Sequence, residues 1–453
     1  MARKKENLTS AERLEEALVP DWEQPYKVPE NWCWTRIAKL CSLSNGKAFK
    51  PTDWTETGIP IVRIQNLNNP EAQYNLYSGA VEDKFRLCGG ELLFAWSGTP
   101  GTSFGAHIWW GKEAVLNQHI FRVDFDEKYI NKIYFKYAIN QQLDMLISVA
   151  HGGAGLQHVT KGVFEATPIP LPPFAEQQRI VDRIESLFAK LDEAKQKAQD
   201  ALDSFETRKA AILHKAFTGE LTAQWRKEHG VGMESWDYPR FEYCILKMQN
   251  GLAKRSGSSG TSFVVLRLAN LSDNGFVTDD LREILLDEKE QKNYSLKDND
   301  VLMIRVNGSK DNVGKQFLFH GKLKWAFCDH IIRITYKTNL SPEYMVYFSK
   351  TNTYRRYIED NMVSSAGQNT ISRKGMASLL TPIPLMDEQT EIVRILDDLL
   401  AKEQQAREAA ERVLEQIDLI KKAILARAFR GELGTNDPGE ESAVELLKQI
   451  SSC

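Results

Sequence analysis

One phrase occurs twice in the sequence, and this repetition constrains the fold more than any other feature. The first copy, TPIPLPPFAEQQRIV, begins at Thr167, and the second, TPIPLMDEQTEIV, begins at Thr381. A constant offset of 212 residues relates Ile180 to Ile392 and continues to the last matching segments, ILHKAFTGEL and ILARAFRGEL. This period is far longer than the roughly 20–50 residues of solenoid repeats. The chain is therefore a tandem duplication of a domain with its connector.

The prolines of each phrase favour extended backbone, and a long helix is expected after them. Between Phe174 and Thr218 the first copy contains no proline or glycine. Its heptad spacing, repeated in the second copy, predicts helices of about 43 residues and about 65 Å each. Gly219 and Gly431 follow the two segments, where C-terminal caps are expected. The predicted seam residues are Ile180, Ile184, Leu187, Leu191, Ala194, Ala198, Ala201, Phe205 and Ile212, then Ile392, Leu396, Leu399, Ala406, Ala410, Val413, Ile417 and Ile424.

A long helix with a single apolar seam is marginal alone, so each seam requires a partner. The duplication favours an intramolecular antiparallel pair of helices. Such a pair is expected to hold the two preceding domains at its opposite ends, related by an approximate two-fold axis. A coiled coil between separate molecules is the alternative.

Composition argues against several classes of protein. The chain has 453 residues, a net charge of −3 and a hydrophobic content of 42%, which suggests a globular protein of about three folding units. No apolar run approaches the roughly 18 residues of a membrane span, and the N-terminus lacks the apolar stretch of a signal peptide. Six scattered cysteines form no C-x-x-C pair, which argues against zinc and against a disulfide framework. These features predict a cytoplasmic protein with no membrane association.

A β-rich unit is expected before each long helix, spanning residues 44–165 and 244–375. The apolar runs IPIVRI, ELLFAW and HIFRV of the first unit correspond to FVVLRL, VLMIRV and HIIRIT of the second. The intervening segments WSGTPGTSFGAHI and RVNGSKDNVGKQF share little beyond glycines. One scaffold with different loops predicts two versions of a recognition module that read two different targets.

Charge distinguishes the second module from the first. Residues 301–375 contain 12 lysines and arginines against 5 aspartates and glutamates, a local excess of seven positive charges. Interleaved aromatic and amide side chains make this a nucleic-acid footprint, although a solvated face is the alternative explanation. The first module is not basic overall, and its candidates lie in the NGK turn, after the strand IPIV and in a glycine loop.

Polar residues in the strand-flanked loops of both modules are predicted to contact DNA. In the first module these residues are Lys47, Arg63, Gln65, Asn66, Ser97, Thr99, Thr102, Gln157, His158 and Thr160. In the second module they are Arg267, Asn270, Arg305, Asn307, Ser309, Lys310, Asn312, Lys315, Gln368, Asn369, Thr370 and Ser372.

The candidate motifs for catalysis and metal binding each depart from the pattern that their chemistry requires. GTSFG fits the G-x-S-x-G pattern, but its flanks do not form a strand-to-helix turn and the second copy has no equivalent serine. The segment from Gly308 to Lys315 departs from a P-loop in spacing and lacks the hydroxyl that binds Mg²⁺. His119 and His330 recur at equivalent positions, and a satisfied histidine beside a core strand is favoured over a metal ligand. The sequence therefore predicts no catalytic, metal or cofactor residues in this chain.

The proline phrase occurs twice, and each copy is followed by a long helix that ends in GEL. A chain with this pattern resembles the specificity subunit of Type I restriction-modification systems. The opening SAERLEEALVPDWEQPYKVPENW and the tail GELGTNDPGEESAVELLKQI also resemble segments of that family. The resemblance covers essentially the whole chain. It implies an α+β fold in which two long antiparallel helices, an intramolecular coiled coil, separate two β-rich target-recognition domains.

The resemblance also implies a function. Each recognition domain would read one half of a bipartite, asymmetric site in double-stranded DNA. The helices would set the spacing and dock two copies of the modification (methyltransferase) subunit, and restriction or translocase subunits would join them. S-adenosylmethionine, ATP and Mg²⁺ would be bound by those partners, and this chain would be non-catalytic.

The expected organisation follows the repeat. It comprises an N-terminal segment with recognition domain 1 (1–165), a proline segment with the first long helix (166–221), a linker with recognition domain 2 (222–375), the second long helix (376–434) and a tail helix (435–453). The main alternative function is a coiled-coil adaptor for two protein ligands. A second alternative is an autonomous DNA enzyme, but the missing catalytic constellation argues against it.

Overall fold

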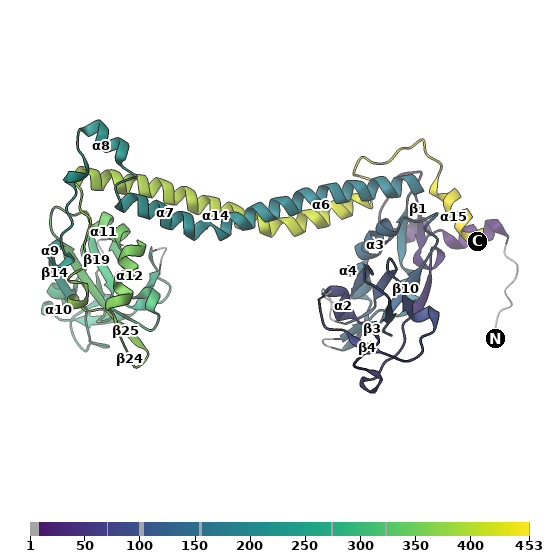
Figure 1. Ribbon diagram of the computed structural model, residues 1–453, viewed down its shortest axis with the longest axis horizontal. Coiled ribbons are helices and arrows are strands. Elements are labelled where there is room, and N and C mark those ends of the chain that lie inside the picture. Colours follow the sequence, from purple (N-terminus) through teal and green to yellow (C-terminus); the bar gives the residue numbers. More distant parts are fainter. Residues whose placement is uncertain are drawn as a thin grey trace. The chain divides into compact units, whose positions relative to one another are not determined.

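The computed structural model of the chain describes residues 9–69, 71–98, 104–153, 156–272, 275–321 and 324–452. The chain forms two compact units, and Figure 1 labels their elements. Unit 1 comprises residues 1–197 and 413–453, and unit 2 comprises residues 198–412. We call the part of unit 1 that carries strands β1 to β13 domain 1, and the part of unit 2 that carries strands β14 to β25 domain 2.

Domain 1 is organised around an antiparallel sheet of order β2-β10-β6-β8. A mixed sheet of order β4-β3-β9-β5, a small sheet of order β11-β12-β7 and the pair β1-β13 complete it. The strands are β1 (Cys33–Arg36), β2 (Ser42–Asn45), β3 (Ile59–Val62), β4 (Asn75–Tyr77), β5 (Arg86–Leu87), β6 (Leu92–Ala95), β7 (Ser97–Gly98), β8 (Gly105–Ile108), β9 (Ala114–Leu116), β10 (Ile120–Asp124), β11 (His151–Gly153), β12 (Leu156–His158) and β13 (Pro168–Leu171).

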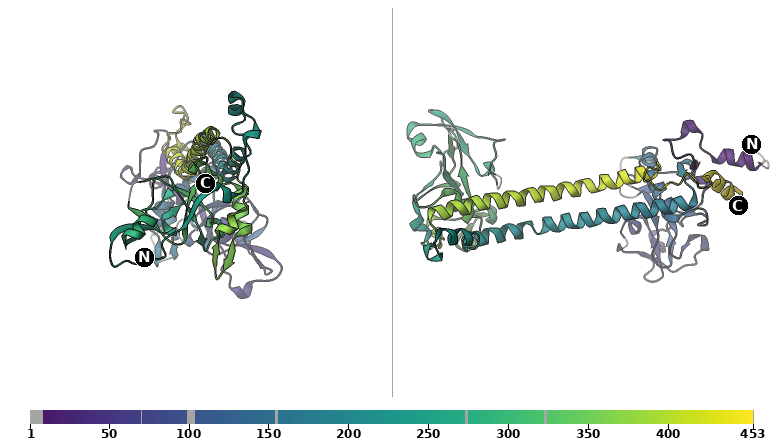
Figure 2. Two further views of the ribbon diagram at one scale, coloured as in Figure 1. Left: turned by 90° about the vertical axis from the view of Figure 1, so that its left-hand side faces the viewer. Right: turned by 90° about the horizontal axis from the view of Figure 1, so that it is seen from above.

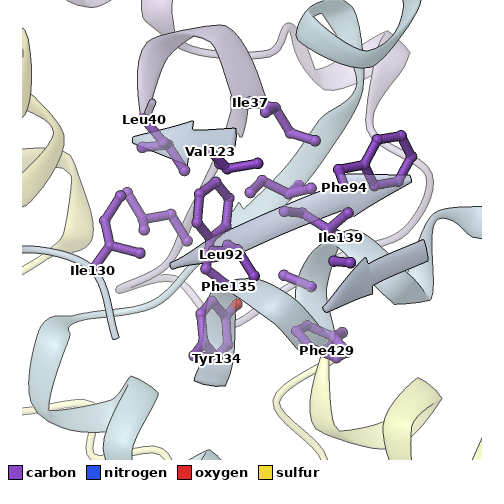
Figure 3. Close-up of a cluster of buried hydrophobic side chains, with 14 of the residues drawn as sticks. Ile37, Leu40, Leu92, Phe94, Val123, Ile130, Tyr134, Phe135, Ile139 and Phe429 are labelled. Carbon is purple, nitrogen blue, oxygen red and sulfur yellow. The ribbon is translucent and has the colours of Figure 1, made fainter. Parts of the chain in front are cut away.

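Helices from both ends of the chain pack on the core of unit 1. Phe94 of β6 lies in this core, and Phe429, which follows the second long helix, packs against Tyr134 with ring centroids 5.4 Å apart (Figure 3). The terminal helices α1 and α15 also pack together. The helices of this unit are α1 (Ser10–Ala17), α2 (Ile64–Asn68), α3 (Lys132–Gln141), α4 (Leu143–Ser148), α5 (Lys161–Ala166), most of α6 (Phe174–Asp203), the end of α14 (Met386–Ala428) and α15 (Ala443–Ser452).

Domain 2 repeats the scaffold of domain 1. Its central sheet, β14-β23-β19-β21, corresponds strand for strand to β2-β10-β6-β8, and its small sheet, β20-β25-β24, corresponds to β7-β12-β11. The strands are β14 (Ile245–Asn250), β15 (Thr261–Leu266), β16 (Leu271–Ser272), β17 (Gly275–Phe276), β18 (Glu283–Leu286), β19 (Asp300–Ile304), β20 (Val306–Asn307), β21 (Gln316–Phe319), β22 (Trp325–Phe327), β23 (Ile331–Tyr336), β24 (Val363–Ser365) and β25 (Gln368–Thr370). The strands predicted from the matching apolar runs are confirmed.

Phe241, Tyr344 and Tyr354 come from three helices of unit 2 and lie in one core beside its central sheet. The helices of this unit are the end of α6, α7 (Phe205–Phe217), α8 (Ala223–His229), α9 (Phe241–Cys244), α10 (Glu288–Tyr294), α11 (Pro342–Phe348), α12 (Asn352–Asn361), α13 (Arg373–Met376) and the first part of α14. Among the described residues, no helix is long and apolar enough to cross a membrane.

In each unit the two long helices run antiparallel, as predicted (Figure 2). In unit 1, Asp192 of α6 pairs with Lys421 near the end of α14 at 2.5 Å. In unit 2, Arg208 of α7 pairs with Glu403 in the first half of α14 at 2.9 Å. Gly219 and Gly431 have φ values of +81° and +73°, which agrees with their predicted capping role. The pairing is intramolecular, as the duplication suggested.

Two expectations about the helices were wrong in detail. The first helix is not continuous, because Ser204 separates α6 from α7. The Ser204 hydroxyl donates to the carbonyl of Asp200, four residues back, a bond that often bends helices. Ala406 and Val413 are exposed rather than in the seam. In this part of α14, Arg407 lies over the ring of Phe205 at 5.2 Å, so a polar contact replaces the expected apolar one.

A Glu-Gln pair at the start of each long helix ties the helix to its domain. Gln177 accepts from the backbone of Asn131 at 2.8 Å, and Gln389 accepts from the backbone of Ser341 at 2.9 Å. The preceding glutamates, Glu176 and Glu388, are fully buried. The residues that the two copies of the repeated phrase share therefore make equivalent contacts in the two units.

The buried glutamates bind the chain that follows the opposite long helix. Glu176 accepts from the hydroxyl of Thr435 at 2.7 Å, just beyond α14. Glu388 accepts from the hydroxyl of Thr222 at 2.6 Å, just beyond α7, and from Arg226 at 2.6 Å. The start of each helix is thus bonded to the segment after the end of the other.

Candidate nucleic-acid interface

The segments predicted to contact DNA come together in one small sheet in each domain. In domain 1, β7 pairs with β12, so that Ser97 lies opposite His158. In domain 2, β20 pairs with β25, so that Asn307 lies opposite Asn369. The sequence predicted loops here, and the structure instead shows short antiparallel strands. Residues separated by about sixty positions in the chain therefore form one surface.

The backbone that supports these small sheets is the same in both copies. The Trp96 amide donates to the carbonyl of His119, and the Trp96 carbonyl accepts from Val159. Arg305 makes the equivalent bonds, to the carbonyl of His330 and from the amide of Ile371. Since backbone groups make all four bonds, the side chain at this position is unconstrained by them. The frame accordingly presents tryptophan in domain 1 and arginine in domain 2.

Polar and aromatic side chains cluster beside the small sheet of domain 1. The Ser97 hydroxyl and His158 Nδ1 are 2.8 Å apart. The Trp96 ring lies 5.4 Å from the ring of His119 and 5.8 Å from that of His158. Burial, followed by the charges of His158 and Arg63, lowers the pKa of His119. Arg63 and His158, both predicted site residues, therefore lie in the neighbourhood of His119.

Three residues of this cluster were not among the predicted DNA contacts. Trp96 Nε1, Gln118 Oε1 and His119 Nδ1 are buried atoms without a hydrogen-bond partner among the described residues. The expectation that His119 is a satisfied core histidine is therefore wrong for its Nδ1 atom. Unpartnered buried polar groups are rare in proteins and call for an explanation. The available sequence signal was the equivalent placement of the NQH and CDH segments before β10 and β23.

In domain 2, amide side chains organise the small sheet. Asn369 donates to the carbonyl of Gly308 at 2.8 Å and accepts from the Ser364 hydroxyl at 2.6 Å. The Asn307 side chain accepts from the amide of Ser309 at 2.8 Å. Asn369 is buried, so it holds the strands together, whereas Gln368 beside it is exposed. Thr370 is partly buried opposite Val306.

A basic loop follows β20. Its single helical turn, η7 (Lys310–Asn312), is held by Arg355 of α12, which donates to the carbonyls of Val313 at 2.7 Å and Asp311 at 2.9 Å. Ser309 and Lys310 are exposed on this loop, and Asn312 is partly buried. Arg305 is partly buried next to β20. The second domain thus presents lysine and amide groups on a braced loop beside its small sheet.

The structure assigns four predicted site residues to structural tasks. Asn66 and Asn270 are each 1% exposed, and their side chains accept from the backbones of Arg63 and Arg267. Their prediction as DNA contacts is wrong, because an amide that is buried and already hydrogen-bonded within the protein does not reach an external ligand. The hydroxyls of Thr160 and Ser372 cap α5 and α13.

The remaining candidates fall into distinct groups. Lys47 donates to the Tyr77 hydroxyl at 2.7 Å, and Arg267 pairs with Asp280 at 2.7 Å. Gln65 is exposed at the start of α2, and Lys315 lines a cavity in unit 2. For Gln157 the structure describes only the backbone, in β12. Thr99 and Thr102 lie outside the described residues.

One group of possible metal ligands occurs among the described residues. Cys328, Asp329 and His330 are consecutive, and one ligand atom from each lies within 4.8 Å of the others. Asp329 also faces Arg255 at 3.5 Å, so its charge already has a protein partner. Three adjacent residues of this kind do not make a metal centre. The five described cysteines are free.

Residues 29–202 and 240–413 each match the Type I restriction modification DNA specificity domain. The chain belongs to this family. The two matched segments are the two copies found in the sequence, each reaching into a long helix. Members of the family are specificity subunits and are not themselves enzymes. The membership supports DNA recognition over a coiled-coil adaptor.

The matches among known proteins span nearly the whole specificity subunit. The chain is 28% identical to the Type I restriction enzyme StySPI specificity subunit of Salmonella potsdam over 455 residues, which cover 94% of this chain and 96% of that protein. It is 26% identical to the EcoKI specificity subunit of Escherichia coli (strain K12), with the same coverage of both chains.

Solved structures of the family share the fold. The HsdS subunit from Thermoanaerobacter tengcongensis aligns with a TM-score of 0.63 at 17% identity, covering 90% of this chain and 99% of that one. A chain from a study of complex assembly and conformational transition in the type I R-M system aligns with a TM-score of 0.58 at 18% identity, covering 90% of this chain. The α+β architecture with two tandem domains is therefore that of this specificity-subunit family.

Proposed function

We propose that the small sheets of domains 1 and 2 face double-stranded DNA and that each reads one half of a bipartite, asymmetric site. The observation that carries this proposal is the shared backbone frame with unlike side chains. Trp96 and Arg305 occupy one position in it, and Gly98 and Asn307 occupy another. Two half-sites of different sequence require such a pair of readers, since base discrimination comes from side chains.

The side chains of each sheet suit different contacts. Asparagine and glutamine pair with adenine and arginine pairs with guanine, whereas exposed lysines neutralise phosphates. In domain 2 we assign base reading to Arg305, Asn307 and Gln368, and phosphate binding to Lys310. The proposed contacts also retain Ser97, Gln157, His158, Ser309, Asn312, Thr370, Lys47, Arg63, Gln65 and Arg267, with Thr99 and Thr102 in the segment outside the described residues.

In domain 1 we add Trp96, Gln118 and His119 to the proposed interface. Each has a buried polar atom without a partner among the described residues, beside the Ser97–His158 pair. A base edge supplies both donors and acceptors, so DNA would satisfy these atoms. The cost of leaving them unpaired in the free protein would favour binding of the matching base.

We also propose that two modification subunits dock at equivalent places. Phe174 and Met386 begin the two long helices, at the constant offset of the repeat, and they are 41% and 39% exposed. Large exposed apolar side chains at matched positions suit two copies of one partner. Restriction or translocase subunits would join this complex in the cytoplasm. S-adenosylmethionine, ATP and Mg²⁺ would be bound by the partner subunits.

The proposed functional division of the chain follows the sequence boundaries. Recognition domain 1 lies within 1–165 and recognition domain 2 within 222–375, and each is followed by a spacer helix, within 166–221 and 376–434. The tail, 435–453, completes the unit that contains the N-terminus. The helices would set the spacing between the two half-sites.

The recognition proposal is tested by measuring methylation in the reconstituted complex on a library of randomised bipartite targets. Asn307→Ala and Gln118→Ala are each expected to relax one half-site and leave the other unchanged, by about 1–3 kcal/mol of discrimination at the affected base pair. Lys310→Ala is expected to weaken binding on all sequences and to reduce its salt dependence.

A matched lysine provides the control. Lys337 is exposed at the other end of β23 from His330 and the small sheet, so Lys337→Ala should leave affinity and both half-sites unchanged. The assignment fails if Asn307→Ala and Gln118→Ala retain wild-type specificity, or if either alters both half-sites. Methylation by the purified chain alone would contradict its non-catalytic role.

A further inference from the structure

Unit 2 contains a cavity of about 650 Å³ that the recognition surface does not use. Its walls come from α7, β17, β21, α11 and the start of α12. Small-molecule sites in proteins have volumes of roughly 300–1,000 Å³, so the space suits a ligand of nucleotide size.

The cavity is lined by four cationic side chains. Lys209 comes from α7, Lys315 precedes β21, Lys350 follows α11 and Arg355 lies on α12. Glu206 is the carboxylate of the lining, and it lies 3.9 Å from Lys209. The hydroxyl of Ser349 and the amide of Asn352 add neutral hydrogen-bonding groups. Such a lining favours an anion with several oxygen acceptors, since charge-assisted bonds to phosphate are among the strong hydrogen bonds in proteins.

An apolar surface accompanies these cations. Phe276 of β17 and Phe317 of β21 line the same cavity, together with Leu213 of α7. Phe317 is 9% exposed, so its position is fixed by packing. Aromatic side chains provide stacking surfaces for nucleobases, and each stacked base contributes roughly 1–3 kcal/mol. The combination of an aromatic surface with clustered cations matches a base that carries phosphates.

The duplicated domain shows that the fold does not require this basic lining. Ala95 and Ile304 are equivalent residues of the central strands; Gly105 lies opposite Ala95 and Lys315 lies opposite Ile304, so Gly105 corresponds to Lys315. Asn131 and Ser341 begin equivalent helices through matching bonds to Gln177 and Gln389, and the same spacing from them places Asn140 at the position of Lys350.

Asn140 closes the equivalent region of domain 1. Its side chain accepts from the amide of Ala106 at 2.7 Å and donates to the carbonyl of Ala106 at 3.0 Å. Domain 1 thus joins helix and strand directly, whereas domain 2 has the cations Lys315 and Lys350 in place of Gly105 and Asn140, around an open space.

We infer that this cavity in unit 2 binds a nucleotide, with its phosphates on Lys209, Lys315, Lys350 and Arg355 and its base against Phe276 and Phe317. The source of the nucleotide is either a free nucleoside triphosphate or an unpaired nucleotide of the DNA. This inference rests on the lining of the cavity and on its comparison with domain 1. Binding of a free nucleotide does not depend on the proposed recognition surface.

The test is isothermal titration of the full chain with ATP, with inorganic triphosphate and with a short single-stranded oligonucleotide. Lys350→Asn introduces the domain 1 residue at an exposed position, and Lys337→Ala is the matched control. Loss of one charge-assisted phosphate bond is expected to raise the Kd for ATP roughly tenfold in Lys350→Asn. Lys337→Ala should leave it unchanged, and triphosphate should bind more weakly than ATP because it lacks the base.

The arms separate the two sources. A tenfold weaker ATP affinity in Lys350→Asn identifies a free nucleotide as the ligand, whereas a loss confined to the oligonucleotide identifies a nucleotide of DNA. The inference is overturned if neither ligand is affected, if ATP does not bind at millimolar concentration and the oligonucleotide is insensitive, or if Lys337→Ala causes an equal loss. Equal affinities for triphosphate and ATP would overturn the assignment of a base.

Discussion

Trp96 and Arg305 occupy one position in two copies of a backbone frame, and neither side chain takes part in the bonds that define it. Asn66 and Asn270, in contrast, are identical in both copies because their side chains bond the backbone. Single residues therefore diverge where the main chain alone holds the structure. This separation allows recognition to change without a change of fold.

We expect His119 to make the stability of domain 1 depend on pH. Burial, then the charges of His158 and Arg63, lowers the pKa of His119 below its ordinary value. A histidine whose pKa is lower in the folded protein than in the unfolded chain binds fewer protons in the folded state. Its stabilising contribution is therefore complete above about pH 6.5, the unfolded value, and is lost as the pH falls below it. We expect thermal stability to decline from pH 7.5 to 5.5.

The variant His119→Gln should show a shallower decline over the same pH range. His107 is the matched comparison, since burial, followed by the charge of Lys136, also lowers its pKa. Calorimetric unfolding of His119→Gln and His107→Gln across this pH range measures how much each histidine contributes to the decline in stability. An unchanged slope in His119→Gln would show that this ring does not titrate in the predicted window.

Thiol chemistry offers a second test at this scale. Burial raises the pKa of Cys33 to about 12 and that of Cys41 to about 12 as well, whereas Cys88 is exposed. Since the thiolate is the nucleophile, Cys88 should react with a thiol reagent in the native protein, and Cys33 and Cys41 only after unfolding. Cys453 lies outside the described residues, so the assay uses the Cys453→Ser background. Rapid native labelling of Cys33 would contradict the burial argument.

At the scale of elements, each long helix begins with a buried glutamate that binds the segment after the other helix. The surroundings of these two glutamates differ. Arg226, the partner of Glu388, has a side chain only 8% exposed, whereas Arg179, beside Glu176, is 37% exposed. Trp236 also donates to Glu388, at 3.0 Å. The junction in unit 2 is therefore the drier of the two.

This difference predicts unequal costs for the same substitution. Glu388→Ala leaves a buried guanidinium without its partner and should destabilise unit 2 by about 3–5 kcal/mol. Glu176→Ala should cost less, about 1–3 kcal/mol, because water reaches Arg179. Denaturant unfolding of both variants makes the comparison. Equal losses would show that exposure of the arginine does not govern the cost.

At the scale of the whole molecule, the proposed role of the long helices is to set the spacing of the half-sites. Insertion of four residues near Ala198 and near Ala410 adds about 6 Å and about 400° to each helix, so the apolar seam is nearly preserved. Since one base step is about 3.4 Å, the optimal spacer should lengthen by one or two base pairs, with the half-sites unchanged.

Methylation by the assembled complex, on targets that differ only in spacer length, measures this effect. Insertion into the loop after Gly230, outside both helices, is the control and should leave the optimal spacer unchanged. A variant that assembles but keeps the original spacer would show that the helices do not set the distance. Altered half-site bases would show that recognition extends beyond domains 1 and 2.

The sequence by itself determined the elements whose formation is local. Apolar spacing identified the long helices, Gly219 and Gly431 marked their ends through positive φ, and the matching apolar runs located the central strands. These signals suffice because helix caps and strand alternation depend on residues close in the chain. The duplication added the intramolecular pairing, since each seam had a matching partner within the same chain.

The tertiary structure alone decided which distant residues meet. Ser97 and His158 became neighbours through the pairing of β7 with β12, and no local pattern specifies that partner. Packing also buried Asn66, which the sequence suggested as a DNA contact, and exposed Val413, which the heptad pattern placed in the seam. Burial and long-range pairing depend on the whole fold, because a side chain's surroundings come from segments far away in the chain.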